Sequence, residues 1–312
     1  MKPPLRKKRL PVLGAAAQWM GTTRHWGPRL LRTFVNEVGV RITRPTHLPT
    51  PLLWSPSTVT ATWLGHASVL INFYGLTIVT DPVLSRRIGA SIGRRTLGPK
   101  RLIAPALTVD QLPPIDIVLL SHAHLDHLHI ATLNLFPPTT QVVTAWNTKD
   151  LLLGTKMKDV YELRWGDRIL LNRPHGEIAI EAFEVAHWGA RWRHDRHRGF
   201  NGYILERNGK KLLFGGDTAF CEHFKKLKDK GPFDLAVMPI GSYKAAEICW
   251  HCTPEEAAQM ANDAGANYIL PIHHMTFNFG KEIQMEPIQR FQRALAAERI
   301  ALREVGETFI LP

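Results

Sequence analysis

Cysteine is scarce in this sequence: the 312 residues include only Cys221, Cys249 and Cys252. Three cysteines cannot build a disulfide framework, which excludes the small disulfide-stabilised secreted class and favours a reducing compartment. The chain also lacks an apolar run of about eighteen residues, so it predicts no membrane-spanning helix. It contains no internal repeat and no low-complexity tract, which excludes repeat architectures. These absences leave an ordinary globular chain.

Acidic residues are almost missing from the beginning of the chain. Residues 1–44 contain Glu37 as their one acid against ten Lys or Arg, and so carry +9 of the total charge of +12. A basic block of this kind suits an anionic membrane surface or nucleic acid. Residues 1–57 therefore predict a basic extension. Its apolar residues between Trp26 and Val38 have helical spacing, which indicates either a membrane-contacting amphipathic helix or a helix docked on its own domain.

Residues 58–312 alternate between short apolar strands and helical segments, with a meander of strands first. This order predicts a single α/β domain in which helices cover stacked sheets. Strands are predicted over 58–65, 68–75, 76–82, 115–122, 141–145, 178–187, 201–207, 211–217, 234–241, 267–273 and 308–312. Helices are predicted over 126–135, 147–154, 219–229, 253–264 and 284–299.

The stretch VLLSHAHLDHLH (118–129) concentrates metal-ligand residue types directly after an apolar run. If the strand continues, His122 and His124 point the same way, while Asp126 and His127 begin the next helix and turn back toward them. Imidazole and carboxylate are zinc-type ligands, and this density of donors suits two adjacent metals. A single strand histidine is usually a hydrogen-bonded core residue, but burying this whole cluster without metal would be costly. The motif therefore predicts a metal site.

Three further candidate ligands come at the ends of predicted strands: His187 ends IAIEAFEVAH, Asp217 ends KLLFGGD and His273 ends NYILPIH. In α/β proteins ligands gather beyond the carboxyl ends of strands. A carboxylate after two glycines suits a bridge between two cations, because glycine lets the backbone approach closely. Taken singly, Asp217 could cap the next helix and each histidine could be a core residue. As a set, the three predict two completed coordination shells.

These motifs resemble the metallo-β-lactamase superfamily, through HAHLDH and the later His, Asp and His. Over residues 61–312, the blocks WLGHASVLI, TDPVLS, GPKR, GGDTAF, GPFDLAVMPIGSY, HCTPEEA and IHHMTF are similar to its N-acyl-phosphatidylethanolamine-hydrolysing phospholipase D branch. The resemblance implies a four-layer αββα sandwich that binds two Zn²⁺ ions. The implied ligands are His122, His124 and His187 for one zinc, Asp126, His127 and His273 for the other, and Asp217 for both.

Residues around this ligand set also match the branch. Asp81 in TDP resembles an aspartate that orients a ligating histidine, whereas His66 in LGHAS is either such an outer residue or a plain turn residue. His251 matches a pocket histidine that would bind phosphate or assist the leaving group, unless it merely lies beside a helix start. His274 is not predicted to be a ligand, and His129 is predicted to lie on the surface.

The expected activity is metal-dependent hydrolysis. A hydroxide shared by two zinc ions is a nucleophile at neutral pH, and both ions stabilise negative charge in the transition state. The resemblance implies a phosphodiester substrate of the N-acyl-phosphatidylethanolamine type. The predicted catalytic residues are Asp126, Asp217 and His251. Arginines in 86–101 and 190–199 either receive the anionic head group or lie in solvated loops.

Other functions stay open on the sequence alone. They are a lactonase or nuclease of the same superfamily, a basic binding protein on the same scaffold, and an iron oxidoreductase with similar ligands. Nucleic acid is the less expected substrate. The expected location is the cytoplasm, with peripheral contact to the inner membrane face through residues 1–57. The sequence does not predict the oligomeric state.

Overall fold

The computed structural model describes residues 41–312 except 93–94, 193, 245–248 and 280–281, and only the backbone of 90–92, 95 and 97. Residues 41–312 form one compact unit. Residues 41–57, which the sequence analysis assigned to the extension, pack with this unit: the backbone of Thr43 pairs with Ile103. The helix predicted between Trp26 and Val38 lies outside the described residues. Among the described helices, none is long and apolar enough to cross a membrane.

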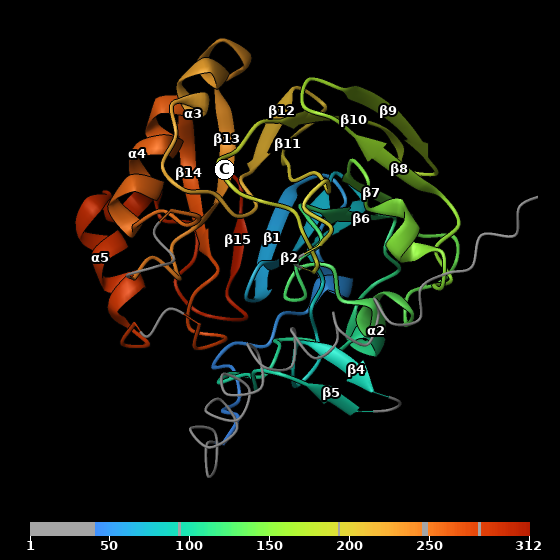
Figure 1. Ribbon diagram of the computed structural model, residues 1–312. Helices are drawn as coiled ribbons and strands as arrows, with labels where there is room; N and C mark the ends of the chain where they lie inside the picture. Colours follow the sequence, from blue (N-terminus) through green and yellow to red (C-terminus); the bar gives the residue numbers. More distant parts are fainter. Residues whose placement is uncertain (1–40, 93–94, 193, 245–248, 280–281) are drawn as a thin grey trace, which may run out of the picture. The chain divides into compact units, whose positions relative to one another are not determined.

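Two mixed sheets stack face to face (Figure 1). In spatial order the first contains β15 (Thr308–Ile310), β1 (Val59–Gly65), β2 (Ser68–Phe73), β3 (Leu76–Thr80), β6 (Ile117–Leu120), β7 (Gln141–Ala145) and β8 (Val160–Leu163). The second contains β14 (Ala266–Ile272), β13 (Phe233–Pro239), β12 (Lys210–Phe214), β11 (Gly202–Arg207), β10 (Gly176–Phe183) and β9 (Arg168–Arg173). A small separate sheet pairs β4 (Ala90–Ile92) with β5 (Arg95–Leu97).

Each large sheet changes from antiparallel to parallel pairing along its width. The strands β1, β2 and β3 pair antiparallel through tight turns, and so do β9 with β10 and β11 with β12. A longer loop, residues 184–201, joins the antiparallel pair β10 and β11. The pairs β3 with β6, β6 with β7, β7 with β8, β12 with β13 and β13 with β14 are parallel and need longer crossover connections. Such connections begin in loops beyond the carboxyl ends of the strands, where candidate ligands were predicted.

The helices are shorter than predicted, with one exception. Helix α4 (Pro254–Ala264) matches its prediction because Thr253 and Glu256 form a capping box and Gly265 ends the helix in a left-handed conformation. The other α-helices in the described part of the chain are α2 (Ile130–Leu133), α3 (His223–Lys226) and α5 (Glu286–Ala294). Single 3₁₀ turns are η1 (Pro51–Leu53), η2 (Val109–Gln111), η3 (Lys149–Leu152), η4 (Leu227–Lys230) and η6 (Ala297–Arg299).

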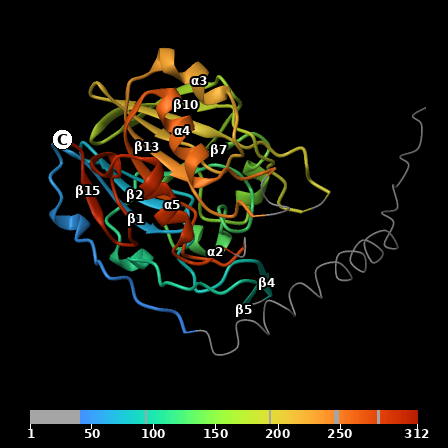
Figure 2. The same ribbon diagram turned by 90° about the vertical axis from the view of Figure 1, so that its left-hand side faces the viewer.

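Two buried apolar clusters hold these layers together. The larger lies between the sheets and joins residues such as Val118 of β6 to Leu235 of β13. The other lies between the second sheet and its helices, where Met260 of α4 and Phe291 of α5 are fully buried. Figure 2 shows α4 and α5 over this sheet. The predicted sandwich of stacked sheets with flanking helices is confirmed.

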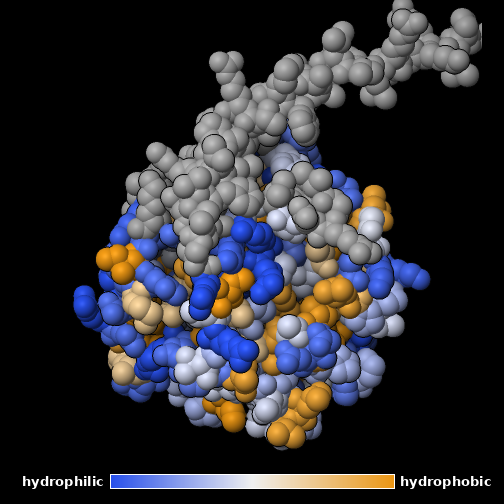
Figure 3. All heavy atoms as spheres, turned by 90° about the horizontal axis from the view of Figure 1, so that it is seen from below, coloured by the Kyte–Doolittle hydropathy of each residue, from blue (hydrophilic) through white to orange (hydrophobic). Residues whose placement is uncertain are grey.

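The surface carries apolar residues in small groups. On the face shown in Figure 3, hydrophobic residues alternate with hydrophilic ones. Single apolar residues among polar ones are normal on protein surfaces.

Candidate metal centre

The candidate ligands lie in loops that follow strands of both sheets. His122 and His124 follow β6, Asp217 follows β12, and His273 comes directly after β14. The Gly-Gly pair before Asp217 has the role expected of it: Gly216 has φ of +58°, and a Cβ atom there would lie 2.8 Å from Cβ of Ser121. The loops after β6 and β12 can therefore approach each other only with glycine at this position.

One half of the centre consists of His122, His124, His187 and Asp217, whose ligand atoms all lie within 4.8 Å of one another. Nε2 of His122 lies 2.7 Å from Nδ1 of His124, and Nε2 of His187 lies 3.3 Å from the same atom. Three imidazoles therefore face one point together with a carboxylate. This is the donor set and the tetrahedral count that zinc takes in proteins.

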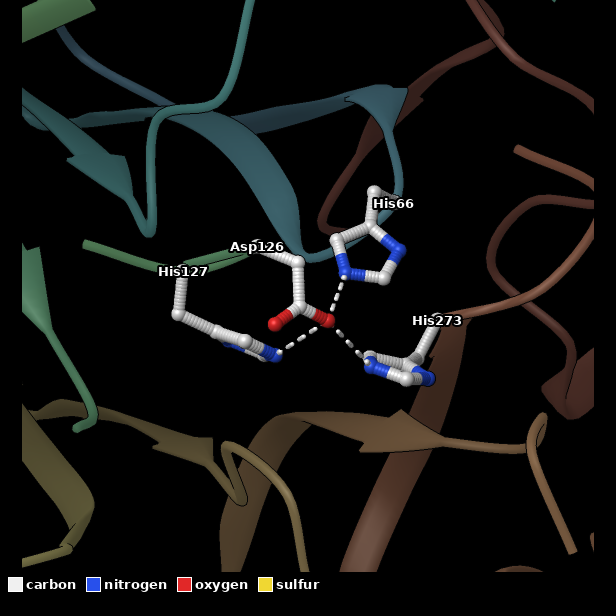
Figure 4. A group of neighbouring side chains, drawn as sticks. All are labelled: His66, Asp126, His127 and His273. Atoms are coloured by element: carbon white, nitrogen blue, oxygen red, sulfur yellow. Dashed lines mark hydrogen bonds and ion pairs between the residues drawn. The ribbon is translucent and has the colours of Figure 1, made fainter. Parts of the chain in front are cut away.

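The other half consists of His66, Asp126, His127 and His273, again with one ligand atom each within 4.8 Å of the others (Figure 4). Oδ2 of Asp126 is the common point: it lies 3.0 Å from Nε2 of His66 and 3.6 Å from Nε2 of both His127 and His273. The predicted trio is therefore brought together, and His66 joins it.

Asp217 connects the two halves. Its Oδ2 lies 3.0 Å from Nε2 of His127 and 3.2 Å from Nε2 of His273. The same oxygen lies 3.8 Å from Nε2 of His187 and 4.0 Å from Nε2 of His122. One carboxylate oxygen thus faces histidines of both halves, which is the arrangement needed to bridge two cations.

Hydrogen bonds on the outer nitrogens fix the ligand rings. Nδ1 of His127 donates to Oδ2 of Asp81 at 2.7 Å, and Nδ1 of His187 donates to the carbonyl of Trp250 at 2.8 Å. Oγ of Ser121 lies 2.8 Å from Nδ1 of His122 and donates to Asp81 at 2.6 Å. Such partners orient the inner nitrogen toward a metal. Asp81 was predicted in this place, but Ser121 and the Trp250 carbonyl were not.

Burial and close charges shift the titration of these groups. Burial would raise the pKa of the Asp217 carboxyl, but His127 and His273 hold it well below its usual range. Burial and neighbouring imidazoles lower the pKa of His122 well below its usual value, which favours the neutral ring that binds metal. Burial would also lower the pKa of His273, yet Asp217 and Asp126 raise it to about 9.

Three atoms that face the centre lack hydrogen-bond partners. Nε2 of His127, Nε2 of His273 and Oδ1 of Asp217 are buried without a hydrogen bond. Unpaired buried polar atoms are costly and rare in native proteins. Two cations among these imidazoles and carboxylates would supply the missing partners, so the residues fit a dinuclear metal site.

Two local predictions were wrong. Asp126 and His127 do not begin a helix: they lie in a turn, and α2 starts at Ile130. His129 is not on the surface: it is buried at 3% exposure, and its Nδ1 accepts from the backbone N–H of Thr132 as the helix cap. The ring points inward because it accepts this hydrogen bond as the helix cap.

His251 and His274 take different places. Nδ1 of His251 lies 4.0 Å from Oδ2 of Asp217, and its ring lies 5.2 Å from that of His273. His251 therefore reaches the centre, as predicted for a pocket residue. His274 instead stacks on Trp63 with ring centroids 4.5 Å apart. It belongs to none of the clusters that could hold a metal among the described residues.

Three arginines of the stretches 86–101 and 190–199 bind other parts of the chain. Arg101 donates to the carbonyls of Val83 and Ile103, and Arg191 donates to the carbonyls of Ala123 and Leu128. Arg198 forms ion pairs with Asp150 and Asp195. These guanidinium groups hold loops around the centre, and head-group binding by arginines of the two stretches stays a prediction.

Aromatic side chains lie beside the first half of the centre. The ring of Trp188 packs against His124 at 4.4 Å, and Trp250 lies 6.0 Å from Trp188. Both tryptophans keep substantial exposure, 36% and 40%. A half-exposed indole pair next to a metal site offers apolar surface to a bound substrate.

Comparison with known proteins places the chain in a family. The family model described as the beta-lactamase superfamily domain matches residues 77–274. N-acyl-phosphatidylethanolamine-hydrolyzing phospholipase D 1 of Caenorhabditis elegans is 33% identical over 260 residues, which cover 78% of this chain and 71% of the relative. A metal-dependent hydrolase of Methanoculleus marisnigri is 26% identical over 79% of this chain and 94% of its own length.

Solved structures share the fold. A metallo hydrolase from the archaeon Ignicoccus hospitalis superposes with a TM-score of 0.61 at 20% identity, covering 82% of this chain and 99% of the archaeal one. At this identity the likeness concerns the fold alone. Together with the family match and the two histidine and aspartate clusters, it leads to one conclusion. The chain is a metal-dependent hydrolase of the metallo-β-lactamase superfamily.

Proposed function

We propose that the protein is a dinuclear zinc phosphodiesterase that hydrolyses phospholipids of the N-acyl-phosphatidylethanolamine type. The observation that carries the proposal is the convergence of two ligand sets on one carboxylate oxygen of Asp217. The substrate class is supported by the relative from Caenorhabditis elegans, which is named for this reaction and is 33% identical over 78% of the chain.

The ligands divide between two cations. His122, His124 and His187 would hold one zinc, Asp126, His127 and His273 the other, with Asp217 on both. When bound, the two ions supply a hydroxide at neutral pH and stabilise negative charge on the phosphoryl oxygens. Zinc is favoured over magnesium or calcium because most of the donors are imidazoles.

The remaining residues act on the substrate. Hydrolysis breaks one P–O bond, puts a hydroxyl from water on phosphorus and delivers a proton to the departing alcohol oxygen. His251 is the residue we assign to this proton, because its buried Nδ1 has no hydrogen bond and faces Asp217 at 4.0 Å. Trp188 and Trp250 would contact the apolar part of the lipid near the scissile bond.

The proposal includes a place of action. A phospholipid substrate lies in a bilayer, and the basic residues 1–57 would bring the enzyme to an anionic inner membrane face from the cytoplasm. Vesicle sedimentation tests this part. Full-length protein should bind vesicles that contain phosphatidylserine and should dissociate from them as the salt concentration rises. Equal partition with neutral vesicles would contradict it.

The central experiment measures metal and turnover together. Zinc-loaded protein should contain two zinc ions by mass spectrometry and should release N-acylethanolamine from N-acyl-phosphatidylethanolamine in mixed micelles. Asp217→Ala should lower turnover on the order of a thousandfold, whereas Asp229→Ala, which changes an exposed aspartate, should leave it unchanged.

Other substrates decide between the alternatives. Hydrolysis of acyl lactones or of RNA and DNA, with no cleavage of the phospholipid, would contradict the substrate and support the lactonase or nuclease. Two iron ions in protein purified without added metal, with no hydrolysis by the zinc form, would overturn the zinc phosphodiesterase altogether.

A further inference from the structure

His66 lies at the centre without belonging to the ligand set that the sequence motifs define. It occupies the turn between β1 and β2, far in sequence from the other members of its cluster. Its ring is fully buried, and its Nε2 lies 3.0 Å from Oδ2 of Asp126 (Figure 4). A buried histidine at hydrogen-bond distance from a candidate metal ligand needs a reason beyond turn formation.

The backbone of His66 is held more tightly than a turn requires. Its N–H donates to Oγ1 of Thr276 at 2.7 Å, and its carbonyl accepts from Nε1 of Trp63 at 2.7 Å. The same carbonyl accepts from the backbone N–H of His273 at 2.9 Å. His66 is thus hydrogen-bonded directly to the backbone of a candidate ligand that comes from the other sheet.

The conformation of His66 is also unusual. Its φ of +56° lies in the left-handed region, which is uncommon for residues other than glycine, although histidine, asparagine and aspartate adopt it more often than the rest. Such residues cost free energy and cluster where surrounding contacts impose them. The phenyl rings of Phe277 and Phe279 pack edge-on against the imidazole at 5.1 Å and 5.8 Å, which fixes the direction of the ring.

We propose that His66 is a positioning residue for the second metal: its Nε2–H donates to Oδ2 of Asp126 and sets the direction of that carboxylate. The role rests on the dinuclear site of the proposed function. Asp126, His127, His273 and Asp217 already give this cation four protein donors, so His66 acts through Asp126 rather than as a fifth ligand. A freely rotating Asp126 would hold the cation less tightly, because ligand groups need fixed orientation.

Two substitutions separate positioning from a turn role. His66→Gln places an amide nitrogen near the former Nε2 position and keeps a donor for Asp126. His66→Asn tolerates the left-handed backbone well, but its amide ends near the former Nδ1 position, short of Asp126. The pair therefore differs in reach toward the carboxylate, while Asn is the better residue for the turn.

The test is a titration of metal-free full-length protein with Zn²⁺ against a chromophoric chelator, together with the melting temperature of the metal-free form. We expect His66→Asn to melt like wild type without metal and to bind the first zinc normally. Its second zinc should bind about ten- to a hundredfold more weakly. His66→Gln should recover most of this affinity.

Each other outcome overturns the proposal. Normal binding of both zinc ions by His66→Asn would make His66 a turn residue. Equal loss of the second zinc in both variants would make His66 a direct ligand, since glutamine is a poor zinc ligand. A wild-type protein that binds fewer than two zinc ions would overturn the dinuclear site itself. Zinc binding does not depend on the substrate, so a wrong substrate class would leave this test unaffected.

Discussion

The two halves of the metal centre are built differently. The first half holds its rings through neutral groups: the Trp250 carbonyl accepts from His187, and the Ser121 hydroxyl contacts His122. The second half uses carboxylates, with Asp81 on Nδ1 of His127 and Asp126 within reach of His66. Charge therefore accumulates on one side of the shared Asp217.

The backbone differs between the halves as well. His66, Asp81 and His273 all have positive φ, of +56°, +33° and +65°, and all three belong to the second half or its outer partner. None of the ligands of the first half has a positive φ. Strained backbone at one half shows that its geometry depends on contacts made elsewhere in the fold. The first half depends mainly on where its strands end.

The largest effect should come from removing Asp217, the residue that the two halves share. Asp217→Ala would take one donor from each of the two proposed cations. Since the metals stabilise the transition state by several kcal/mol, turnover should fall on the order of a thousandfold. Loss of both zinc ions by mass spectrometry would accompany it. Retention of both ions would show that Asp217 is not the bridge.

A chelator should remove the zinc ions of the two halves one after the other. The first half has three imidazole donors and the second has two together with the Asp126 carboxylate, and nitrogen ligands suit zinc better than oxygen. Rising chelator should therefore release the zinc of the second half first. At a free zinc concentration of about a hundred times its Kd, each ion stabilises the folded protein by about 2.7 kcal/mol. The melting temperature should therefore fall in two steps as chelator is added. A single step would show that the halves act as one site.

Asp81→Asn should weaken only the second half. Asparagine keeps the size of the side chain but gives Nδ1–H of His127 a neutral acceptor instead of a carboxylate. Loss of such an outer partner costs about ten- to a hundredfold in metal affinity. The zinc that chelator removes first should become easier to remove. Ser121→Ala is the matched control. It should weaken the binding of both zinc ions, each by less, because Ser121 contacts Asp81 and His122 alike.

The first half could be predicted from sequence to a greater extent than the second. The density of donor residues directly after an apolar strand indicated His122 and His124 as ligands, although β6 ends at Leu120 and does not continue through them. The convergence of Asp217 with them follows from a glycine pair that lets two loops meet. Predicted strands were mostly found, but β4, β5, β8 and β9 were missed. Strand β9 lies at the edge of its sheet and begins and ends with an arginine, so its sequence does not show the alternation of apolar and polar residues that predicts a strand.

The second half depends on contacts that no local pattern contains. His66 precedes Asp126 by 60 residues, and their hydrogen bond exists only because the sheets bring the two loops together. The inward direction of His129 was likewise decided by its role as helix cap rather than by spacing. The partners of Arg191 and Arg198 are likewise carbonyls and carboxylates that meet them only in the folded chain.

The smallest expected effect is a pH-dependent loss of stability beside the first half, at Asp195. The loop after His187 is closed by Asp195, whose carboxylate accepts from Nε of Arg198 and from the backbone N–H of Trp192, both at 2.6 Å. Burial would raise the pKa of Asp195, but these bonds hold it below its usual value. A carboxyl with a lowered folded pKa stabilises the fold above its unfolded pKa of about 3.9, and this stability is lost as pH falls through the folded value.

Asp195→Asn should remove this contribution. At pH 7 the metal-free variant should melt lower than wild type by a few degrees, about 2–4 °C, and the difference should shrink below about pH 4 as wild-type Asp195 becomes protonated. Because the loop lies beside the first half, zinc there should bind slightly more weakly, while the second half keeps its affinity. A larger loss at the second half would mean that the 188–199 loop supports the whole centre, and that the halves are not independent.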